Sequence, residues 1–399
     1  MIYSLRTFRF LGIMTTLLPF LHGNIASAQT LPVPAHIVIL FEENYAYSQI
    51  IGSASAPHIN ALATDPHAAL FTQFFAIEHP SQPNYIDVFS GNNQGITDDN
   101  LPSSEVSDYP FTTPNLAAEL LTAGKTFITY SEDLPAVGSD VQTYTAGGAN
   151  YARKHNPCTN WVGTGANQFA ATLNQPYTNF PTNFDALPTV SFVVPNMTND
   201  MHDYTCASLP CPESIALGDT WMYNHLDSLR SWSLANNTLY ILVYDEDDDF
   251  HNNNIPVIFY GPMVKGGTYT ENVNLYNLLH TVESMYGLTH AGNSATSSSI
   301  TDCWLNTTAV SNVSATGHSF TIMPNPASDL ITFNCNIQLN NQVTIIVSDA
   351  AGRTVGTYTM TGSALQVNTS SLVTGSYSYN VIDNNGKKLD EGRFIINHN

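Results

Sequence analysis

Apolar runs of strand length alternate with helix-like segments from residue 36 to about residue 288. The strand-like runs cover residues 36–41, 71–77, 127–130, 190–194, 239–244 and 256–260. The helix-like segments cover residues 115–123, 215–234 and 274–286. Strands that alternate with helices in this way favour a mostly parallel sheet between layers of helices. The pattern therefore predicts an α/β domain, with a Pro- and Asn-rich excursion over residues 134–187 that covers its site.

A different pattern begins after residue 290. Small residues dominate residues 291–299, where the helical spacing stops, and this composition is typical of a linker. Short alternating stretches follow at residues 330–337, 343–348, 376–382 and 392–396, separated by turn sequences. Such stretches predict a small antiparallel β-sandwich.

The first 28 residues have the three parts of a secretory signal peptide. Arg6 and Arg9 precede an apolar stretch, and Ala26-Ser27-Ala28 offers a cleavage site. We therefore expect a secreted or cell-surface protein. No later segment reaches the roughly 20 apolar residues of a membrane span. The predicted parts are a signal peptide (1–28), a catalytic domain (29–290), a linker (291–317) and a C-terminal domain (318–399).

Charge and cysteine content narrow the possible partners and bonds. The chain has 11 Lys and Arg against 32 Asp and Glu, a formal net charge of -21, which disfavours nucleic acid as a partner. Export permits disulfides, and Cys206 and Cys211 are close enough in sequence to close a small loop. A second bridge between Cys158 and Cys303 would leave Cys335 unpaired.

Polar clusters follow three of the predicted strands. Parallel strands deliver the residues at their carboxyl ends to one edge of a sheet, where ligands bind. Oxygen-rich ligands with a single His suit a divalent cation such as Zn²⁺, Mn²⁺, Mg²⁺ or Ca²⁺. The alternative for each cluster alone is a solvated loop, and this alternative fits Asp247 to Asp249 best. The candidate ligands are Glu43, Asn44, Asp200, His202, Asp245 and Glu246.

Ser81 is a candidate nucleophile. Ser81 and Pro83 stand where the cap and first turn of a helix are expected, so Ser81 would lie beside free backbone N–H groups that attract phosphate. A hydroxyl there, activated by a metal, can attack phosphorus. The alternative is that Ser81 only caps the helix.

Two regions resemble known families. Met323-Pro324-Asn325-Pro326-Ala327 and the ending Gly392-Arg393-Phe394-Ile395-Ile396 resemble the C-terminal sorting domain of type IX secretion cargo, over about 80 residues. That resemblance implies export by the type IX machinery and removal of the domain; a generic β-sandwich binding module is the alternative. Residues 36 to 290 resemble the phosphoesterase family of bacterial acid phosphatases and phospholipases C. The matching segments are 36–44, 48–52, 56–60, 79–85, 195–203, 218–221, 245–248, 261–262 and 283–288.

The second resemblance implies an alkaline phosphatase-like fold and a role for each candidate residue. Glu43 and Asn44 match the family's metal-binding pair, and Asp245 and Glu246 match its later acidic pair. Ser81 matches the nucleophile of related nucleotide phosphodiesterases, Asn84 a donor to phosphate oxygen, and Asp200 and His202 ligands of a second metal. The chain departs from the family pattern in the late helix, where Leu275 replaces a usual His and His280 a usual Arg.

Together these features predict a secreted, metal-dependent phosphoesterase that acts on phosphate esters through Ser81. One alternative keeps the fold but acts on a lipid phosphodiester, as phospholipase C does. Another alternative is a surface binding protein that has lost catalysis. The replacement of a usual His by Leu275 would be the first sign of that loss.

Overall fold

The computed structural model describes residues 31–204, 206–305, 320–335, 339, 342–349, 352–384 and 388–398. It divides the chain into two compact units, of which the first ends at Leu305. Ile300 and Trp304 are buried in the core of the first unit, which thus continues beyond residue 290. The predicted signal peptide lies outside the described residues. Among the described helices, none is long and apolar enough to cross a membrane.

An eight-stranded sheet forms the centre of the first unit, in the order β11-β2-β10-β9-β1-β8-β4-β7. Only β10 runs antiparallel to its neighbours, which confirms the predicted mostly parallel sheet. The central strands are buried on both faces, as expected for continuous apolar runs. The strands are β1 (His36–Glu42), β2 (Ala68–Phe71), β4 (Phe127–Ser131), β7 (Asn174–Pro176), β8 (Val190–Val194), β9 (Thr238–Tyr244), β10 (Val257–Tyr260) and β11 (Gly267–Tyr269).

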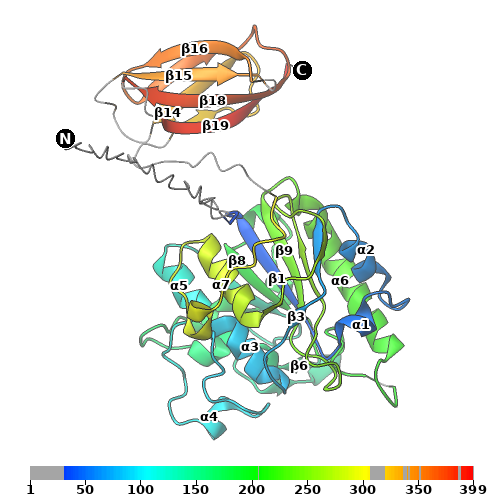
Figure 1. Ribbon diagram of the computed structural model, residues 1–399. Coiled ribbons are helices and arrows are strands. Elements are labelled where there is room, and N and C mark those ends of the chain that lie inside the picture. The colour runs from blue at the N-terminus through cyan, green and yellow to red at the C-terminus, as the bar shows by residue number, and fades with distance from the viewer. Residues whose placement is uncertain are drawn as a thin grey trace, which may run out of the picture. The chain divides into compact units, whose positions relative to one another are not determined.

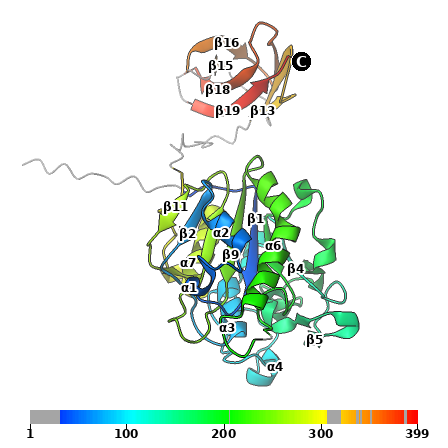
Figure 2. The same cartoon turned by 90° about the vertical axis from the view of Figure 1, so that its right-hand side faces the viewer.

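Helices cover both faces of this sheet (Figures 1 and 2). On one side lie α2 (Pro57–Ala63) and α6 (Pro212–Ser233), with the short α1 (Tyr47–Ile50) beside them. On the other side lie α3 (Ser81–Ser90), α5 (Leu116–Thr122) and α7 (Leu275–Met285). The three helices predicted from spacing are thus confirmed as α5, α6 and α7. A further short helix is α4 (Pro102–Glu105).

One predicted strand, residues 71–77, is divided in the structure. Its beginning belongs to β2, which pairs with β10, whereas β3 (Phe74–Phe75) pairs with β12 (Val273–Asn274) in a separate two-stranded sheet. The excursion over residues 134–187 contains six described 3₁₀ turns, the strand β7 and the short pair β5 (Thr143–Tyr144) and β6 (Tyr151–Ala152).

The second unit consists of two antiparallel sheets, as predicted. A three-stranded sheet has the order β13-β14-β17, and a four-stranded sheet has the order β16-β15-β18-β19. Alternate residues such as Phe333, Tyr379 and Phe394 point into a shared core. The strands are β13 (Phe320–Met323), β14 (Leu330–Cys335), β15 (Val343–Ser348), β16 (Thr354–Met360), β17 (Ala364–Asn368), β18 (Gly375–Asp383) and β19 (Lys388–Ile396).

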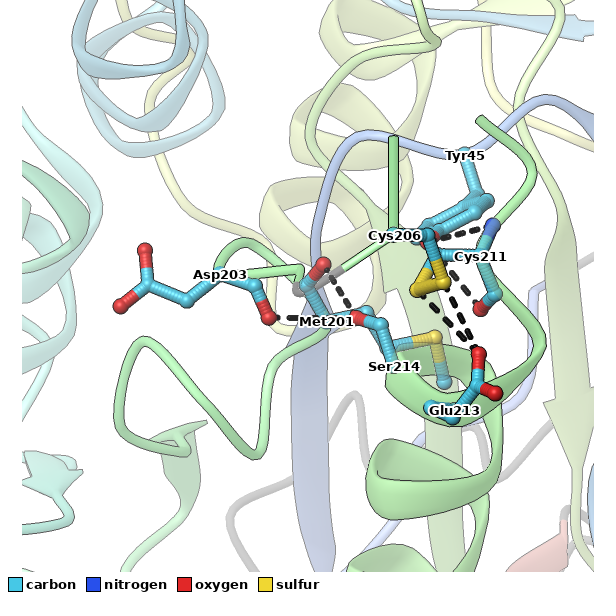
Figure 3. The surroundings of a disulfide bond; sticks show 7 residues. All are labelled: Tyr45, Met201, Asp203, Cys206, Cys211, Glu213 and Ser214. Carbon is cyan, nitrogen blue, oxygen red and sulfur yellow. Dashed lines mark hydrogen bonds between the residues drawn. A yellow bond between two sulfur atoms is a disulfide. The ribbon is translucent and has the colours of Figure 1, made fainter. Parts of the chain in front are cut away.

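A disulfide between Cys206 and Cys211 closes the loop that follows β8, as predicted (Figure 3). The backbone N–H of Cys211 donates to the Tyr45 hydroxyl (3.3 Å), which ties this loop to the segment after β1. Ser214, in the first turn of α6, donates to Met201 O (2.9 Å). The predicted second bridge is wrong, because Cys158 and Cys303 are both free and buried in the hydrophobic core.

Two carboxylates meet between α5 and α7. Burial and the neighbouring Glu283 raise the pKa of Glu119 to about 8. Burial raises the pKa of Glu283 to about 7, although Ser294 and the backbone N–H of Ala291 donate to it. Both groups therefore bind protons more tightly in the folded chain than in the unfolded chain, where the pKa of a Glu is about 4.3.

We predict that removing the disulfide destabilises the first unit. In the chain-entropy treatment a loop of this length contributes about 2 kcal/mol. The Cys206→Ser/Cys211→Ser variant should therefore lose about 2 kcal/mol of unfolding free energy in urea. Dithiothreitol should lower the stability of the wild type by a similar amount. Equal unfolding free energies of the double variant and the wild type would contradict this assignment.

We also predict that the stability of the first unit falls as the pH rises from about 4.5 to about 8. Protons bound to Glu119 and Glu283 in the folded state must be lost over this window, so their contribution is fully present only below the unfolded pKa. Glu119→Gln should leave stability unchanged at pH 4.5 and raise it by about 1 kcal/mol at pH 8. Urea unfolding at both pH values tests this, and an equal change at both would contradict it.

Candidate active site

The central strands bring three polar segments to one edge of the sheet. β8, β1 and β9 are parallel neighbours, so their carboxyl ends meet there. The backbone N–H of Glu43 donates to Asp200 O (2.8 Å), and that of Asp245 donates to Glu42 O (3.1 Å). The residues that follow β1, β8 and β9 are thus held together by main-chain bonds before any side chain contributes.

Ser81 lies against this cluster as the first residue of α3. Its Oγ is 3.0 Å from Glu43 Oε2 and 3.0 Å from Glu246 Oε1, and the residue is 1% exposed. Pro80 holds the N-cap position, and no side-chain bond caps the helix. Ser81 is therefore bonded to carboxylates and does not cap the helix. Because a hydroxyl carries one proton, it can donate to only one of the two carboxylates at a time.

Glu43, Asp245 and Glu246 form a buried carboxylate cluster. One oxygen from each lies within 4.8 Å of the other two, and the residues are 0%, 2% and 5% exposed. Burial and the charges of Glu43 and Glu246 raise the pKa of Asp245 well above its ordinary value. Burial also raises the pKa of Glu246, and His79 opposes this effect.

The carboxylate cluster contains a buried oxygen that has no hydrogen-bond partner among the described residues. This oxygen is Asp245 Oδ2, whereas Glu43 Oε1, also buried, is held by an ion pair with His155 Nε2. Buried polar atoms are normally paired, and an unpaired carboxylate oxygen is the ligand that hard divalent cations prefer. The residues present therefore fit a divalent cation.

His155 joins the carboxylate cluster to Asp200, and it was missed in the sequence. Its Nε2 lies 3.0 Å from Glu43 Oε1, and its Nδ1 lies 2.9 Å from Asp200 Oδ2. Burial lowers the pKa of His155, but the charges of Glu43 and Asp200 outweigh burial and raise it to about 9. For Glu43 burial raises the pKa, but the charge of His155 outweighs it and lowers the pKa to about 2.

His202 approaches the same carboxylate from the loop after β8. Ligand atoms of Glu43, His155 and His202 lie within 4.8 Å of one another, which makes them a second possible metal group. Asp200 Oδ1 accepts the backbone N–H of His202 (2.8 Å), so Asp200 orients both histidines. Lys154 Nζ is 2.8 Å from His202 Nε2. Burial lowers the pKa of Lys154, but Glu43 and Asp99 raise it overall, so this lysine is charged.

The two predicted asparagines contribute in different ways. Asn44 has a φ of 61°, and its backbone N–H lies 3.4 Å from Asp245 Oδ1. The Asn84 amide is bonded to the turn before α3: Oδ1 accepts from the N–H groups of Ile77 and Glu78, and Nδ2 donates to the carbonyls of Glu78 and Pro80. Asn84 thus holds the turn that carries Ser81.

His79 lies beside the carboxylate cluster, whereas Leu275 and His280 lie in the late helix α7. His79 Nδ1 is 2.8 Å from Glu246 Oε2 and orients that carboxylate; the sequence offered no periodic signal for it. Leu275 is buried in the hydrophobic core. His280 forms a hydrogen bond with Ser294 O (2.7 Å) and stacks on His290. Leu275 and His280, the two residues that depart from the family pattern, thus both make packing or hydrogen-bond contacts inside the first unit.

Comparison with protein families gives two matches. The model described as the phosphoesterase family matches residues 54–289, and the secretion system C-terminal sorting domain matches residues 321–397.

Several relatives are phosphatases. A phosphatidylinositol-3-phosphatase of Mycobacterium tuberculosis is 44% identical over 280 residues, covering 70% of this chain and 85% of the relative. An acid phosphatase of Aspergillus fumigatus is 29% identical, covering 56% of this chain and 49% of the relative, so the chain spans about half of that enzyme. Among solved structures, a Vibrio parahaemolyticus protein of the alkaline phosphatase superfamily has a TM-score of 0.48 at 13% identity, covering 77% of each chain.

We predict that a divalent cation stabilises the first unit through the carboxylate cluster. After dialysis against EDTA, the best of Mg²⁺, Ca²⁺, Mn²⁺ and Zn²⁺ should raise the unfolding free energy by about 2.7 kcal/mol at 100 times its Kd. Thermal melts and metal analysis measure this effect. Asp245→Asn should lose most of the gain because an unpaired ligand oxygen is removed.

Asp227→Asn is the matched control, because Asp227 lies on α6 and pairs with Arg230. An equal metal-induced rise in the Asp245→Asn and wild-type proteins would exclude the cluster as the binding site.

Proposed function

The chain belongs to the phosphoesterase family and is a hydrolase of phosphoric ester bonds, and from this premise we propose that Ser81 is its nucleophile and that the carboxylate cluster holds a divalent cation. The observation that carries the proposal is the position of the Ser81 hydroxyl, 3.0 Å from both Glu43 and Glu246. A hydroxyl within hydrogen-bond reach of a proton acceptor is an arrangement that supports nucleophilic catalysis.

In the first step, Ser81 Oγ loses its proton to a neighbouring carboxylate and attacks phosphorus. A P–O bond to Ser81 forms as the bond to the alcohol oxygen breaks, and the alcohol leaves after it takes up a proton. When bound, the cation supplies positive charge that favours the ionised hydroxyl and the transferred phosphoryl group. In the second step, water attacks phosphoserine, inorganic phosphate leaves, and Ser81 regains its proton.

Other residues hold this arrangement in place. Glu43, Asn44, Asp245 and Glu246 are the proposed ligands of the cation, and Asp200 and His202 would hold a second ion. His155 and Lys154 are the positive groups nearest the cluster, and we propose that they favour negative charge on the substrate. The amide hydrogens of Asn84 are bonded to the preceding turn. We therefore propose that Asn84 positions Ser81, in place of the expected contact with phosphate.

The substrate class is proposed to be a phosphomonoester. The named relatives are phosphatases, and the one with 44% identity is named for phosphatidylinositol 3-phosphate, in which the phosphate is a monoester on a polyol. For the phospholipase C alternative, the described site offers no specific support. A direct comparison of phosphate release from a monoester with headgroup release from phosphatidylcholine decides between them.

Export of the enzyme is proposed from both ends of the chain. The C-terminal unit is a secretion system sorting domain, which indicates export through type IX secretion. The signal-peptide sequence at residues 1–28 would provide the preceding transport step.

We predict that Ser81→Ala lowers kcat for p-nitrophenyl phosphate by at least about 10³-fold, since the covalent route is lost. Ser90→Ala is the matched control, because Ser90 is a second buried serine of α3 that bonds Ile86 O and Asn92 O. Acid quenching during turnover should trap phosphate on Ser81, which mass spectrometry detects. Undiminished turnover in Ser81→Ala would rule out the covalent role.

A further inference from the structure

Asp99 places a carboxylate beside the proposed nucleophile. Its Oδ1 accepts the backbone N–H of Gln82 (3.0 Å), the residue that follows Ser81, and its Oδ2 accepts from Lys154 Nζ (2.8 Å). Four covalent bonds separate the Gln82 nitrogen from Ser81 Oγ, so these two atoms lie within about 5 Å of each other. The Asp99 carboxylate is therefore close to the atom that would carry the phosphoryl group.

Lys154 is held in place independently of Asp99. It is the middle residue of a 3₁₀ turn, Arg153–His155, whose two other residues are buried. Arg153 Nη2 donates to the Tyr109 hydroxyl, and both ring nitrogens of His155 pair with carboxylates of the site. Lys154 Nζ also lies 2.8 Å from His202 Nε2, which brings its charge next to the catalytic residues. The fold thus positions this ammonium group to meet an anion bound at the nucleophile.

The loop that carries Asp99 is anchored without the help of its carboxylate. Gln82 Nε2 donates to Asp98 O (2.9 Å) and to Asn100 O (2.7 Å), so the main chain is fixed on both sides of Asp99. Gln82 is 2% exposed, whereas the Asp99 side chain is 32% exposed. The Asp99 side chain can therefore turn towards solvent while its backbone stays where it is.

The two donors that Asp99 occupies are those that a phosphate would use. In serine hydrolases of another fold, the N–H of the residue after the nucleophile stabilises the oxyanion. A lysine ammonium binds phosphate as a point charge. Carboxylate and phosphate oxygens are both acceptors, so Asp99 and a bound phosphate compete for the same hydrogens. Their like charges also repel each other at this short range.

We infer that Asp99 is an internal competitor of phosphate, whose carboxylate occupies Gln82 N–H and Lys154 Nζ in the resting enzyme and turns away when a phosphoryl group binds. The inference rests on the proposed function and adds a residue that sets the affinity for phosphate. The substrate must displace Asp99 before the first step. After the second step the carboxylate returns and favours the release of inorganic phosphate.

The test measures the binding of inorganic phosphate to the full-length, metal-loaded protein by isothermal titration calorimetry. Asp99→Asn removes the negative charge at nearly constant size, so the Kd for phosphate should be about tenfold lower than in the wild type. If Asp99 served only to hold Lys154, the same substitution would weaken phosphate binding. An unchanged or higher Kd therefore overturns the inference, and so does a lack of phosphate binding by both proteins.

Further variants identify the cause of the change. Asp98→Asn is the matched control, because Asp98 is the neighbouring acid of the loop and its carboxylate accepts from Asn100. Its Kd should equal that of the wild type; a fall equal to that in Asp99→Asn would reflect net charge alone and overturn the inference. Asp99→Ala should also bind phosphate more tightly, and it decides the question if Asp99→Asn does not fold. The Asp99→Asn/Lys154→Gln double variant should lose the gain, and a retained gain contradicts competition for Lys154.

Failure of the proposed function gives a different result. In that case p-nitrophenyl phosphate remains intact with the wild type and with every variant. Calorimetry needs no turnover, so tighter phosphate binding by Asp99→Asn still supports the inference and an equal Kd still overturns it. In an active enzyme, competitive inhibition by phosphate should strengthen in Asp99→Asn by the same factor as the Kd falls.

Discussion

Three buried carboxylates, Glu43, Asp245 and Glu246, lie around the Ser81 hydroxyl, which has a single proton to donate. Much of the first unit holds this arrangement in place. Without a cation, Glu43, Asp245 and Glu246 repel one another, and burial together with this repulsion raises the pKa of Asp245. Such a cluster cannot be an ordinary stabilising feature, because each buried charge needs a partner. Its geometry is maintained at a cost in stability, which is typical of functional sites.

Well-packed strands and loops offset this loss of stability and hold the carboxylates in position. β1 and β9 are paired along their whole length, and both are buried on both faces, so the residues that follow them have little freedom. The disulfide at Cys206 and the amide of Asn84 fix the two loops that do not follow those strands. His155 completes the frame, since it lies between Glu43 and Asp200 and supplies a positive charge buried among the acids.

The parts that could be predicted from sequence are those whose signal is local. β8 occupies residues 190–194 as expected, because a strand buried on both faces is a continuous apolar run with polar residues after it. His155 and Arg153 could not be found in this way. They lie in an excursion without periodicity, and their partners Glu43 and Tyr109 are distant in sequence. The expected Cys158–Cys303 bridge failed for a related reason: cysteine number and compartment say nothing about whether two buried side chains are adjacent.

The acidic composition poses a problem for an enzyme whose substrate is an anion, and the segment at residues 153–155 offers a solution. A net charge of -21 repels phosphate esters at long range, but repulsion in water decays within about 8 Å at physiological ionic strength. Short-range attraction can then dominate if cations are concentrated where the substrate binds. Two of the chain's 11 Lys and Arg residues stand side by side at 153 and 154, followed by a positively charged His155. Because all three are largely buried, their charges are screened less than those of the surface acids. In the proposed function, this segment would let an acidic protein bind an acidic substrate.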